Sequence, residues 1–263
     1  MIFPKKSLGQ NFLNDQNVID KIIETVEIKD KSILEVGPGT GQLTKNILKK
    51  FPKKLIAIEK DKILSKLLNQ KLNNDNVKIV NDDILKINEN NLDDDILTVF
   101  GNLPYNISTE ILCKWILNIK NDEFWFDSLV LMFQKEVADR ITANFNTKNY
   151  GRLSIISNWK LDIKKICDVK PSSFYPKPKI ISTVLLLQPK LCFFPLNNPK
   201  NLEKITRIFF MYRRKMLKKP YNELFNGNPK IANELKIDLN LRPQNLNFET
   251  YYKLAKEYEN LRG

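Results

Sequence analysis

Short apolar runs alternate along the first 187 residues with segments whose apolar side chains recur every three or four positions. The short runs predict strands and the periodic segments predict helices that bury one face. This alternation is typical of an α/β fold with a doubly wound, mostly parallel sheet. The predicted strands are 32–36, 54–59, 77–81, 97–101, 128–133, 153–159 and 182–187, and the predicted helices are 18–26, 43–51, 63–72, 109–119 and 135–143.

The last three predicted strands have fewer helices between them, so we expect an antiparallel strand at that edge of the sheet. The pattern then changes. Residues 188–199 contain prolines and asparagines and are predicted to be a linker. Helical patterns follow at 202–217, 229–236 and 248–261. We therefore predict a catalytic domain over residues 1–188 and a small helical domain over residues 189–263.

The positive charge of the chain is concentrated in its second part. The formal net charge is +13, but residues 1–147 hold 20 basic and 21 acidic side chains, whereas residues 148–263 hold 23 and 9. Such an excess predicts a polyanionic partner. Six basic residues and no acidic one lie between positions 207 and 219. The residues expected to contact phosphates are Arg213, Arg214, Lys215, Lys218 and, in a loop of the first domain, Arg152.

Composition excludes several classes of protein. The chain contains no run of about 18 apolar residues, so we expect no membrane-spanning helix. The N-terminus lacks the apolar stretch of a signal peptide. Three widely spaced cysteines predict neither disulfides nor a metal site, and favour the cytoplasm. The absence of histidine excludes a Ser-His-Asp triad and a histidine general base. No long apolar stripe demands a dimer, so we expect a monomer.

A glycine-rich loop follows the first predicted strand, with Gly37, Gly39 and Gly41 leading into a helix. Glycines at this point let the backbone approach a ligand closely. Glu59 ends the next strand, where such folds bind ribose hydroxyls, and Asp83 ends the third, where it can accept from an adenine amine. Together these strand ends predict a nucleoside pocket. The GxGxG spacing and the acidic Glu35 disfavour a pyrophosphate and favour S-adenosylmethionine.

The fourth strand runs directly into Asn102-Leu103-Pro104-Tyr105. An Asn-x-Pro-aromatic tetrad suits methylation of an adenine amine, which needs hydrogen-bond acceptors and alignment rather than a strong base. The Asn102 side-chain oxygen and the Leu103 carbonyl, fixed by Pro104, are expected to accept from the amine, with Tyr105 stacking on the base. Good orientation contributes roughly 7–11 kcal/mol to such a reaction.

Longer motifs carry a resemblance to a known family. They are GQNFL at 9–13, EVGPGTG at 35–41, GNLPYNIS at 101–108, QKEV at 134–137, YGRLS at 150–154, FYPKPK at 174–179 and RRK at 213–215. In this combination the chain closely resembles the ribosomal RNA adenine dimethyltransferases over nearly its whole length. The resemblance implies a Rossmann-like, seven-stranded class I methyltransferase sheet with a small C-terminal all-helical domain.

The resemblance also implies residue roles. Asn11 and Leu13 are expected to close over the methionine part of S-adenosylmethionine, above a floor that includes Gly37. Glu59 should take the ribose and Asp83 the adenine amine, while Asn102 bridges methyl donor and target amine. From the sequence pattern alone, residues 10–13 predict only a helix entry, with Asn14 or Asp15 as N-cap. Phe174 is expected to stack on the flipped target adenine opposite Tyr105.

Two branches of the family are possible. One dimethylates two adjacent adenosines near the 3′ end of small-subunit ribosomal RNA, within the subunit or an assembly intermediate, and takes part in its maturation. The other acts on large-subunit RNA and confers macrolide-type resistance. The sequences of these motifs favour the first branch, which acts on small-subunit RNA. The alternatives left open are a non-catalytic assembly factor, which the intact tetrad disfavours; an NAD-type oxidoreductase, disfavoured by the glycine spacing; and a DNA adenine methyltransferase, disfavoured by the whole-chain resemblance.

Overall fold

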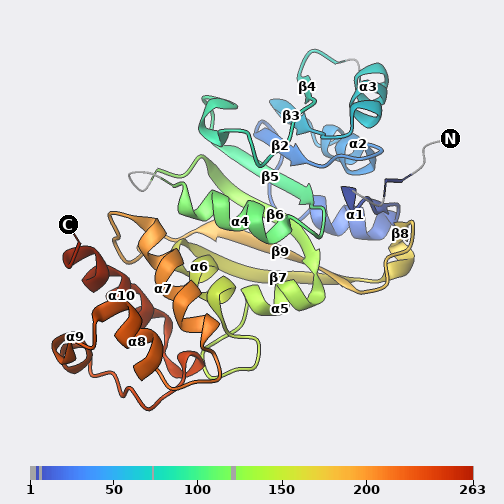
Figure 1. The fold of residues 1–263 in the computed structure, drawn as a ribbon. Coiled ribbons are helices and arrows are strands. Elements are labelled where there is room, and N and C mark those ends of the chain that lie inside the picture. The colour runs from blue at the N-terminus through green and yellow to red at the C-terminus, as the bar shows by residue number, and fades with distance from the viewer. Residues whose placement is uncertain (1–3, 6–7, 73, 120–122, 263) are drawn as a thin grey trace. The chain divides into compact units, whose positions relative to one another are not determined.

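The computed structural model describes residues 4–5, 8–72, 74–119 and 123–262 of the chain (Figure 1). The chain forms two compact units. The first comprises residues 1–114, 119–138 and 162–189, and the second comprises residues 115–118, 139–161 and 190–263. The last segment of the second unit begins at residue 190, next to the boundary predicted at residue 188. The unit also includes the earlier residues 115–118 and 139–161. The functional division at residue 188 stays a prediction.

The first unit is built on a seven-stranded sheet with the order β4-β3-β2-β5-β6-β9-β7. Strands β4, β3, β2, β5 and β6 run parallel, and β9 pairs antiparallel with β6. The predicted fold class and the antiparallel strand are therefore confirmed. The strands are β2 (Ser32–Val36), β3 (Lys54–Ile58), β4 (Val77–Val80), β5 (Leu97–Asn102), β6 (Phe126–Gln134), β7 (Leu161–Val169) and β9 (Ser182–Pro189).

The five predicted helices between the strands are all present. Asp15 caps α1 by accepting from the backbone amides of Asn17 and Val18, as the N-cap prediction required. Asp61 caps α3 in the same way. A short antiparallel pair, β1 (Phe12–Leu13) and β8 (Phe174–Tyr175), stands apart from the main sheet. The helices are α1 (Gln16–Ile23), α2 (Gln42–Leu48), α3 (Lys62–Lys71), α4 (Ser108–Leu117) and α5 (Lys135–Ile141), with 3-10 turns η2 (Glu89–Asn91) and η3 (Pro171–Ser173).

The core of the first unit explains why its strands are so easily found in the sequence. Ile22 of α1 and Ile47 of α2 belong to a buried cluster with Ile33 of β2 and Phe100 of β5. The intervening residues of these strands, such as Leu34, are buried as well. Strands buried on both faces have uninterrupted apolar sequences.

The prediction of a strand at 153–159 was wrong, because this segment forms α6 (Arg152–Lys160). Most of its side chains are buried, so the segment has no polar face and an apolar run of this length cannot be told from a strand. The strand that follows, β7, lies at the sheet edge and carries exposed charged residues such as Asp162. Charges of this kind protect an edge strand but remove its apolar signal.

The second unit is helical, with α7 (Pro199–Met211), α8 (Lys218–Phe225), α9 (Pro229–Glu234), η4 (Pro243–Asn245) and α10 (Phe248–Asn260) beside α6. Phe209 of α7 is buried and meets the ring of Tyr251 edge-on, so it belongs to the core of this unit. The predicted continuous helix over 202–217 was wrong, because α7 ends at Met211. Beyond it the backbone amide of Leu217 donates to the carbonyl of Leu241, which holds residues 212–217 as a turn.

Among the described residues, no helix combines the length and the apolar character that crossing a bilayer requires.

Candidate active site

The strand ends of the parallel sheet bring the predicted pocket residues together. Val36 of β2 lies opposite Ile58 of β3 and Gly101 of β5, so these three strands end at the same level. A pocket opens at this edge. It is lined by residues 8–13, 35–40, 42–43, 58–60, 82–84 and 102–107. Five predicted cofactor residues, Asn11, Leu13, Gly37, Glu59 and Asp83, line it together with Asn102.

The glycine loop has little room for side chains. Gly37 has a φ of +71°, which favours glycine, and its amide donates to the carbonyl of Ile58 at 2.9 Å. A Cβ on Gly39 would lie 2.9 Å from Cδ1 of Phe12. The phenylalanine ring therefore rests directly on the loop, and only glycine fits beneath it.

Glu59 is buried at the end of β3, with both carboxylate oxygens held by backbone amides. Oε2 accepts from Gly39 at 3.1 Å and Oε1 accepts from Asp61 at 2.8 Å. Burial raises the pKa of Glu59, and the backbone hydrogen bonds oppose this. A carboxylate has about four acceptor positions, so the hydrogen bonds from Gly39 and Asp61 leave acceptor capacity on Glu59 for a ribose hydroxyl.

Glu35 is the most deeply buried acid of the pocket, with 1% of its surface exposed. Its Oε2 has no hydrogen-bond partner among the described residues. Burial raises the pKa of Glu35 to about 7, Thr44 opposes the shift, and the nearby Glu59 adds to it. A buried, unpartnered carboxyl oxygen on the pocket wall suits a ligand group that is cationic or donates a hydrogen bond.

Asp83 lies at the pocket edge after β4 and is ion-paired. Its Oδ2 lies 2.7 Å from Nζ of Lys60, and its Oδ1 accepts from the amide of Leu85 at 3.1 Å. The Lys60 side chain holds the pKa of Asp83 below its usual value. Asp83 is therefore an ionised acceptor, as a partner for an adenine amine should be. Lys60 was not predicted, although it follows Glu59 directly at the end of a strand.

The first residue of the tetrad, Asn102, is the last residue of β5. The side-chain Nδ2 of Asn102 donates to the backbone carbonyl of Asn11 at 2.9 Å. Leu103 is buried, and the hydroxyl of Tyr105 lies 2.7 Å from Oγ of Ser182 at the start of β9. Burial raises the pKa of Tyr105, which keeps its hydroxyl protonated. The four residues therefore form one wall of the pocket.

Phe174 lies elsewhere. In the β1–β8 pair it is opposite Leu13, and both side chains are 5% exposed and belong to the hydrophobic core. Its neighbour Tyr175, on the other face of the pair, is 62% exposed. Stacking of Phe174 on a base requires the ring to leave this cluster, and its role stays a prediction.

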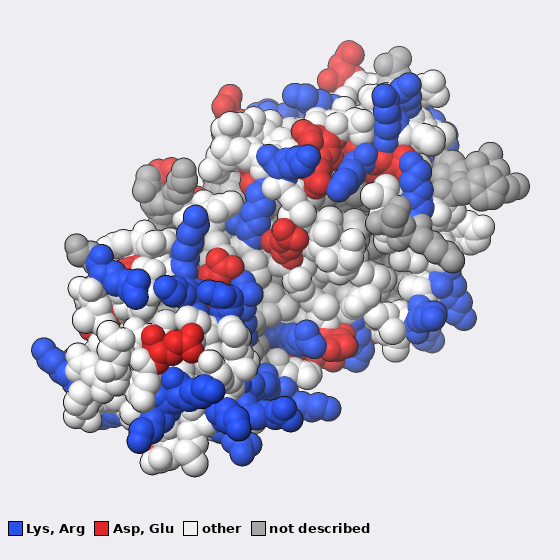
Figure 2. Space-filling model, in the orientation of Figure 1, with Lys and Arg blue, Asp and Glu red and all other residues white. Residues whose placement is uncertain are grey.

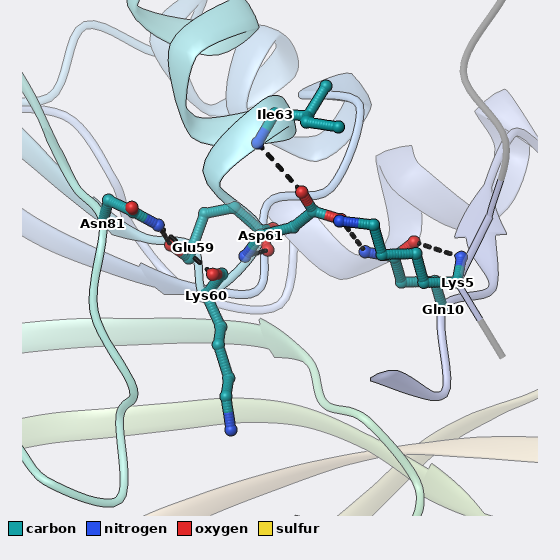
Figure 3. Close-up of polar contacts among 7 residues, drawn as sticks. All are labelled: Lys5, Gln10, Glu59, Lys60, Asp61, Ile63 and Asn81. Carbon is teal, nitrogen blue, oxygen red and sulfur yellow. Dashed lines mark hydrogen bonds and ion pairs between the residues drawn. The ribbon is translucent and has the colours of Figure 1, made fainter. Parts of the chain in front are cut away.

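Sequence reasoning missed a polar cluster beside the pocket, drawn in Figure 3. Asp61 accepts hydrogen bonds from Lys5 and Gln10, which lie more than 50 positions earlier in the chain. Asn81 adds a hydrogen bond from Nδ2 to the carbonyl of Glu59 at 2.7 Å. The position of Asp61 ahead of an amphipathic run is typical of an N-cap, but no local pattern reveals its distant partners.

All five predicted phosphate-contacting residues lie in the second unit; the expectation that Arg152 lies in a loop of the first domain was wrong, because Arg152 is the first residue of α6. Their surroundings differ. Arg213 donates to the backbone carbonyls of Tyr150 and Lys148, and Arg152 is ion-paired with Glu203 at 2.6 Å. By contrast, Arg214, Lys215 and Lys218 are exposed. The sequence did not distinguish these two groups.

The second unit carries most of the positive charge. Its sequence holds 19 basic and 8 acidic side chains, a net charge of +11, against 24 and 22 in the first unit. Figure 2 shows Lys and Arg side chains gathered on the visible face of this unit. The charge excess predicted for the second part of the chain is therefore a property of one compact unit.

Comparisons with known proteins agree with this site. The family model for ribosomal RNA adenine dimethylase matches residues 3–260. Ribosomal RNA small subunit methyltransferase A from Pelagibacter ubique (strain HTCC1062) is 63% identical over 98% of either chain. The protein of the same name from Wolbachia pipientis wMel is 42% identical over 98% of this chain and 90% of its own.

Among solved structures, a dimethyladenosine transferase from Plasmodium falciparum superposes with a TM-score of 0.81 at 28% identity, covering 95% of this chain and 98% of that one. The 23S rRNA methyltransferase ErmE has a TM-score of 0.68 at 21% identity, covering 94% and 99%, and shares the fold. The family and the methyltransferase activity predicted from the motifs are thereby confirmed. The chain belongs to the ribosomal RNA adenine dimethylase family.

Proposed function

We propose that this protein transfers methyl groups from S-adenosylmethionine to the N6 amines of two adjacent adenosines near the 3′ end of small-subunit ribosomal RNA. The observation that carries the proposal is the placement of Asn102 at the end of β5, on the wall of a pocket that also contains Gly37 and Glu59. The register of β2 and β5 brings the glycine loop and the tetrad together.

The pocket residues fit S-adenosylmethionine. The buried carboxylate of Glu59 accepts from the ribose, and ionised Asp83 accepts from the adenine amine. The unpartnered oxygen of Glu35 suits the cationic amino-acid end, next to Asn11 and Leu13. When bound, the cofactor supplies a methyl group activated by a sulfonium.

The tetrad orients the target amine. An adenine amine has two N–H groups, and the side-chain oxygen of Asn102 and the carbonyl of Leu103 provide two acceptors. Donating both hydrogens to these acceptors turns the nitrogen lone pair toward the methyl group, while Pro104 fixes the loop and Tyr105 stacks on the base. The amine loses its proton after alkylation, so the site works without histidine.

The small-subunit branch is supported by the relatives. A protein named ribosomal RNA small subunit methyltransferase A shares 63% of its residues with this chain, whereas the large-subunit enzyme ErmE shares 21%. A non-catalytic assembly factor has no use for an assembled tetrad and cofactor pocket. An NAD-type oxidoreductase and a DNA methyltransferase are disfavoured by the family match.

The RNA substrate is proposed to lie against the cationic second unit. Arg214, Lys215 and Lys218 are exposed there and free to reach phosphates, whereas Arg213 bonds backbone carbonyls and Arg152 is ion-paired with Glu203. The substrate is the small ribosomal subunit or an assembly intermediate, which places the reaction in the cytoplasm. The cysteines at 113, 167 and 192 form no disulfide with one another, which suits that compartment. We propose that the protein acts as a monomer.

The test is an Asn102→Ala variant, assayed for methyl transfer to unmethylated small subunits and for cofactor binding by calorimetry. The proposal predicts measurable cofactor binding with no methyl transfer. Gln16→Ala is a suitable control, because Gln16 hydrogen-bonds Asp20 and lies outside the residues that line the pocket. Full turnover by the Asn102→Ala variant would overturn the assigned role.

A further inference from the structure

The N-terminal segment, defined here as Lys5 and residues 8–13, packs against both sides of the active-site pocket. On the cofactor side, Phe12 lies over Gly39. On the catalytic side, a Cβ on Gly9 would lie 3.3 Å from Oδ1 of Asn106 and 3.9 Å from the backbone nitrogen of Tyr105. The segment is therefore in a position to affect the tetrad directly.

A single buried carboxylate anchors this segment. The side chain of Asp61 is 3% exposed, and its Oδ2 lies 2.9 Å from Nζ of Lys5 and 3.1 Å from Nε2 of Gln10 (Figure 3). Its Oδ1 accepts from the amide of Ile63 at 2.9 Å, and the backbone amide of Lys5 donates to Oε1 of Gln10 at 2.7 Å. Hydrogen bonds to a charged acceptor are stronger than neutral ones, so this anchor is firm.

The anchor is ionised. Burial alone would raise the pKa of Asp61, but Lys5, Ile63 and Gln10 outweigh it and hold the pKa below its usual value. The ionised carboxylate of Asp61 is therefore stabilised by hydrogen bonds from both Lys5 and Gln10. Loss of either donor leaves part of a buried charge unpaired, which is costly.

The segment also determines which way the Asn102 amide faces. The residue after Gln10 is Asn11, whose backbone carbonyl accepts from Nδ2 of Asn102 at 2.9 Å. A carbonyl can only accept, so the NH₂ group of Asn102 must face Asn11 and its oxygen must face away. Rotation of the amide by half a turn would set two oxygens against each other. Asn11 thus selects one of the two orientations of the Asn102 side chain.

We infer that Asp61 is a positioning residue for methyl transfer, which acts through Gln10 and the carbonyl of Asn11 to fix the amide orientation of Asn102. The inference rests on the proposed function in one respect, namely that the Asn102 oxygen accepts from the target amine. If the segment served only as a wall of the cofactor pocket, its anchor would affect cofactor affinity but not the orientation of Asn102.

The anchor is tested by exchanging its donor and acceptor. In a Gln10→Glu variant two carboxylates meet, and in an Asp61→Asn variant the new NH₂ group faces the donors of Gln10 and Lys5. Each change should lower kcat by about 10- to 100-fold, the loss expected when a reacting group is misplaced by about 1 Å. The double variant should recover most of the lost kcat, because asparagine can donate to the new carboxylate while still capping α3. The control Gln16→Ala, which loses a similar amide–carboxylate hydrogen bond, should retain its kcat.

A second measurement follows Asn102 directly. Its side-chain NH₂ signals in ¹⁵N NMR spectra are assigned by their disappearance in Asn102→Asp. In the wild type one of the two protons should exchange slowly with solvent. Both single variants should abolish this protection, and the double variant should restore it. If Asp61 and Gln10 merely stabilised the fold, the single variants would lower the free energy of unfolding but leave the kcat of the folded enzyme and the protection of Asn102 unchanged.

The failures are distinguishable. If Gln10→Glu keeps wild-type kcat and amide protection while Asn102→Ala is inactive, the inference is overturned and the proposed function stands. If Asn102→Ala retains turnover, the proposed role of Asn102 fails. The NMR experiment then still decides whether Asp61 controls the orientation of the amide, since it needs no activity.

Discussion

The hydroxyl of Tyr105 lies 2.7 Å from Oγ of Ser182, which joins the tetrad after β5 to the first residue of β9. Ser182 is fully buried, and it lies three positions after the end of the FYPKPK segment at 174–179. The hydrogen bond therefore fixes the Tyr105 hydroxyl against the start of β9.

A Ser182→Ala change should lower kcat/KM for RNA by about 2- to 12-fold, the equivalent of one ordinary hydrogen bond of roughly 0.5–1.5 kcal/mol. Cofactor affinity should not change. In a Tyr105→Phe background the same substitution should have no further effect, since the hydroxyl partner is already gone. Two losses that simply multiply would show that Ser182 does not act through Tyr105.

A Glu59→Ala change should weaken S-adenosylmethionine binding by about 10-fold or more, because it removes the acceptor for the ribose hydroxyls. It also leaves the amides of Gly39 and Asp61 without their partner. Isothermal calorimetry measures the effect. Glu27→Ala, which likewise removes a carboxylate from a backbone amide but outside the pocket, should bind as the wild type does. Unaltered affinity of the Glu59 variant would show that Glu59 does not bind the ribose.

The buried Glu35 predicts a pH-dependent stability. Its pKa is raised from 4.5 to about 7 in the folded protein, so the native state holds the proton more tightly than the unfolded state. Its contribution is fully present below about pH 4.5 and is lost as the pH rises through about 7, with a total on the order of 3 kcal/mol.

Denaturant unfolding of the cofactor-free protein at several pH values measures this contribution by comparison with Glu35→Gln. The free energy of unfolding of the wild type should fall relative to the variant between about pH 4.5 and 7. A difference that does not vary with pH would mean that Glu35 titrates normally.

The sequence predicted the sheet and the pocket for a physical reason. Gly37, Glu59 and Asp83 follow strands of the parallel part of the sheet and Asn102 ends another, and parallel strands of similar length end at a common edge. The strand pattern alone was therefore sufficient to bring these residues together.

What the sequence did not predict depends on interactions between distant parts of the chain. No periodic pattern in the sequence indicates that Lys5 and Gln10 bind Asp61, or that Phe174 is buried against Leu13. The helix α6 was mistaken for a strand because most of its side chains, polar ones included, are buried, so no polar face marks it as a helix. Contacts between residues far apart in the chain, and a helix whose polar residues are buried, leave no recognisable pattern in the local sequence.

The basic turn after α7 predicts two different effects of substitution. Replacing exposed Arg214 and Lys215 by alanine should weaken RNA binding and reduce the slope of log affinity against log salt by about 1.4–1.8, or about 0.7–0.9 for each phosphate that is no longer neutralised. Arg213→Ala should instead destabilise the fold by roughly 1.5–3 kcal/mol, because its guanidinium bonds two backbone carbonyls.

Filter binding over a salt series measures the slope, and denaturant unfolding measures the loss of stability in Arg213→Ala. Lys253→Ala, which removes a cation that is ion-paired with Glu249 on α10, should leave the slope almost unchanged. An unchanged slope for the Arg214 and Lys215 variant would show that the turn is only a solvated surface.

Mapping methyl transfer on ribosomal subunits tests the proposed reaction itself. The protein is incubated with labelled S-adenosylmethionine and unmethylated small or large subunits, and the modified nucleotides are identified by mass spectrometry and primer extension. The proposed function predicts two methyl groups on the N6 of each of two adjacent adenosines near the 3′ end of the small-subunit RNA. Label confined to large-subunit RNA, or no label on either subunit, would contradict it.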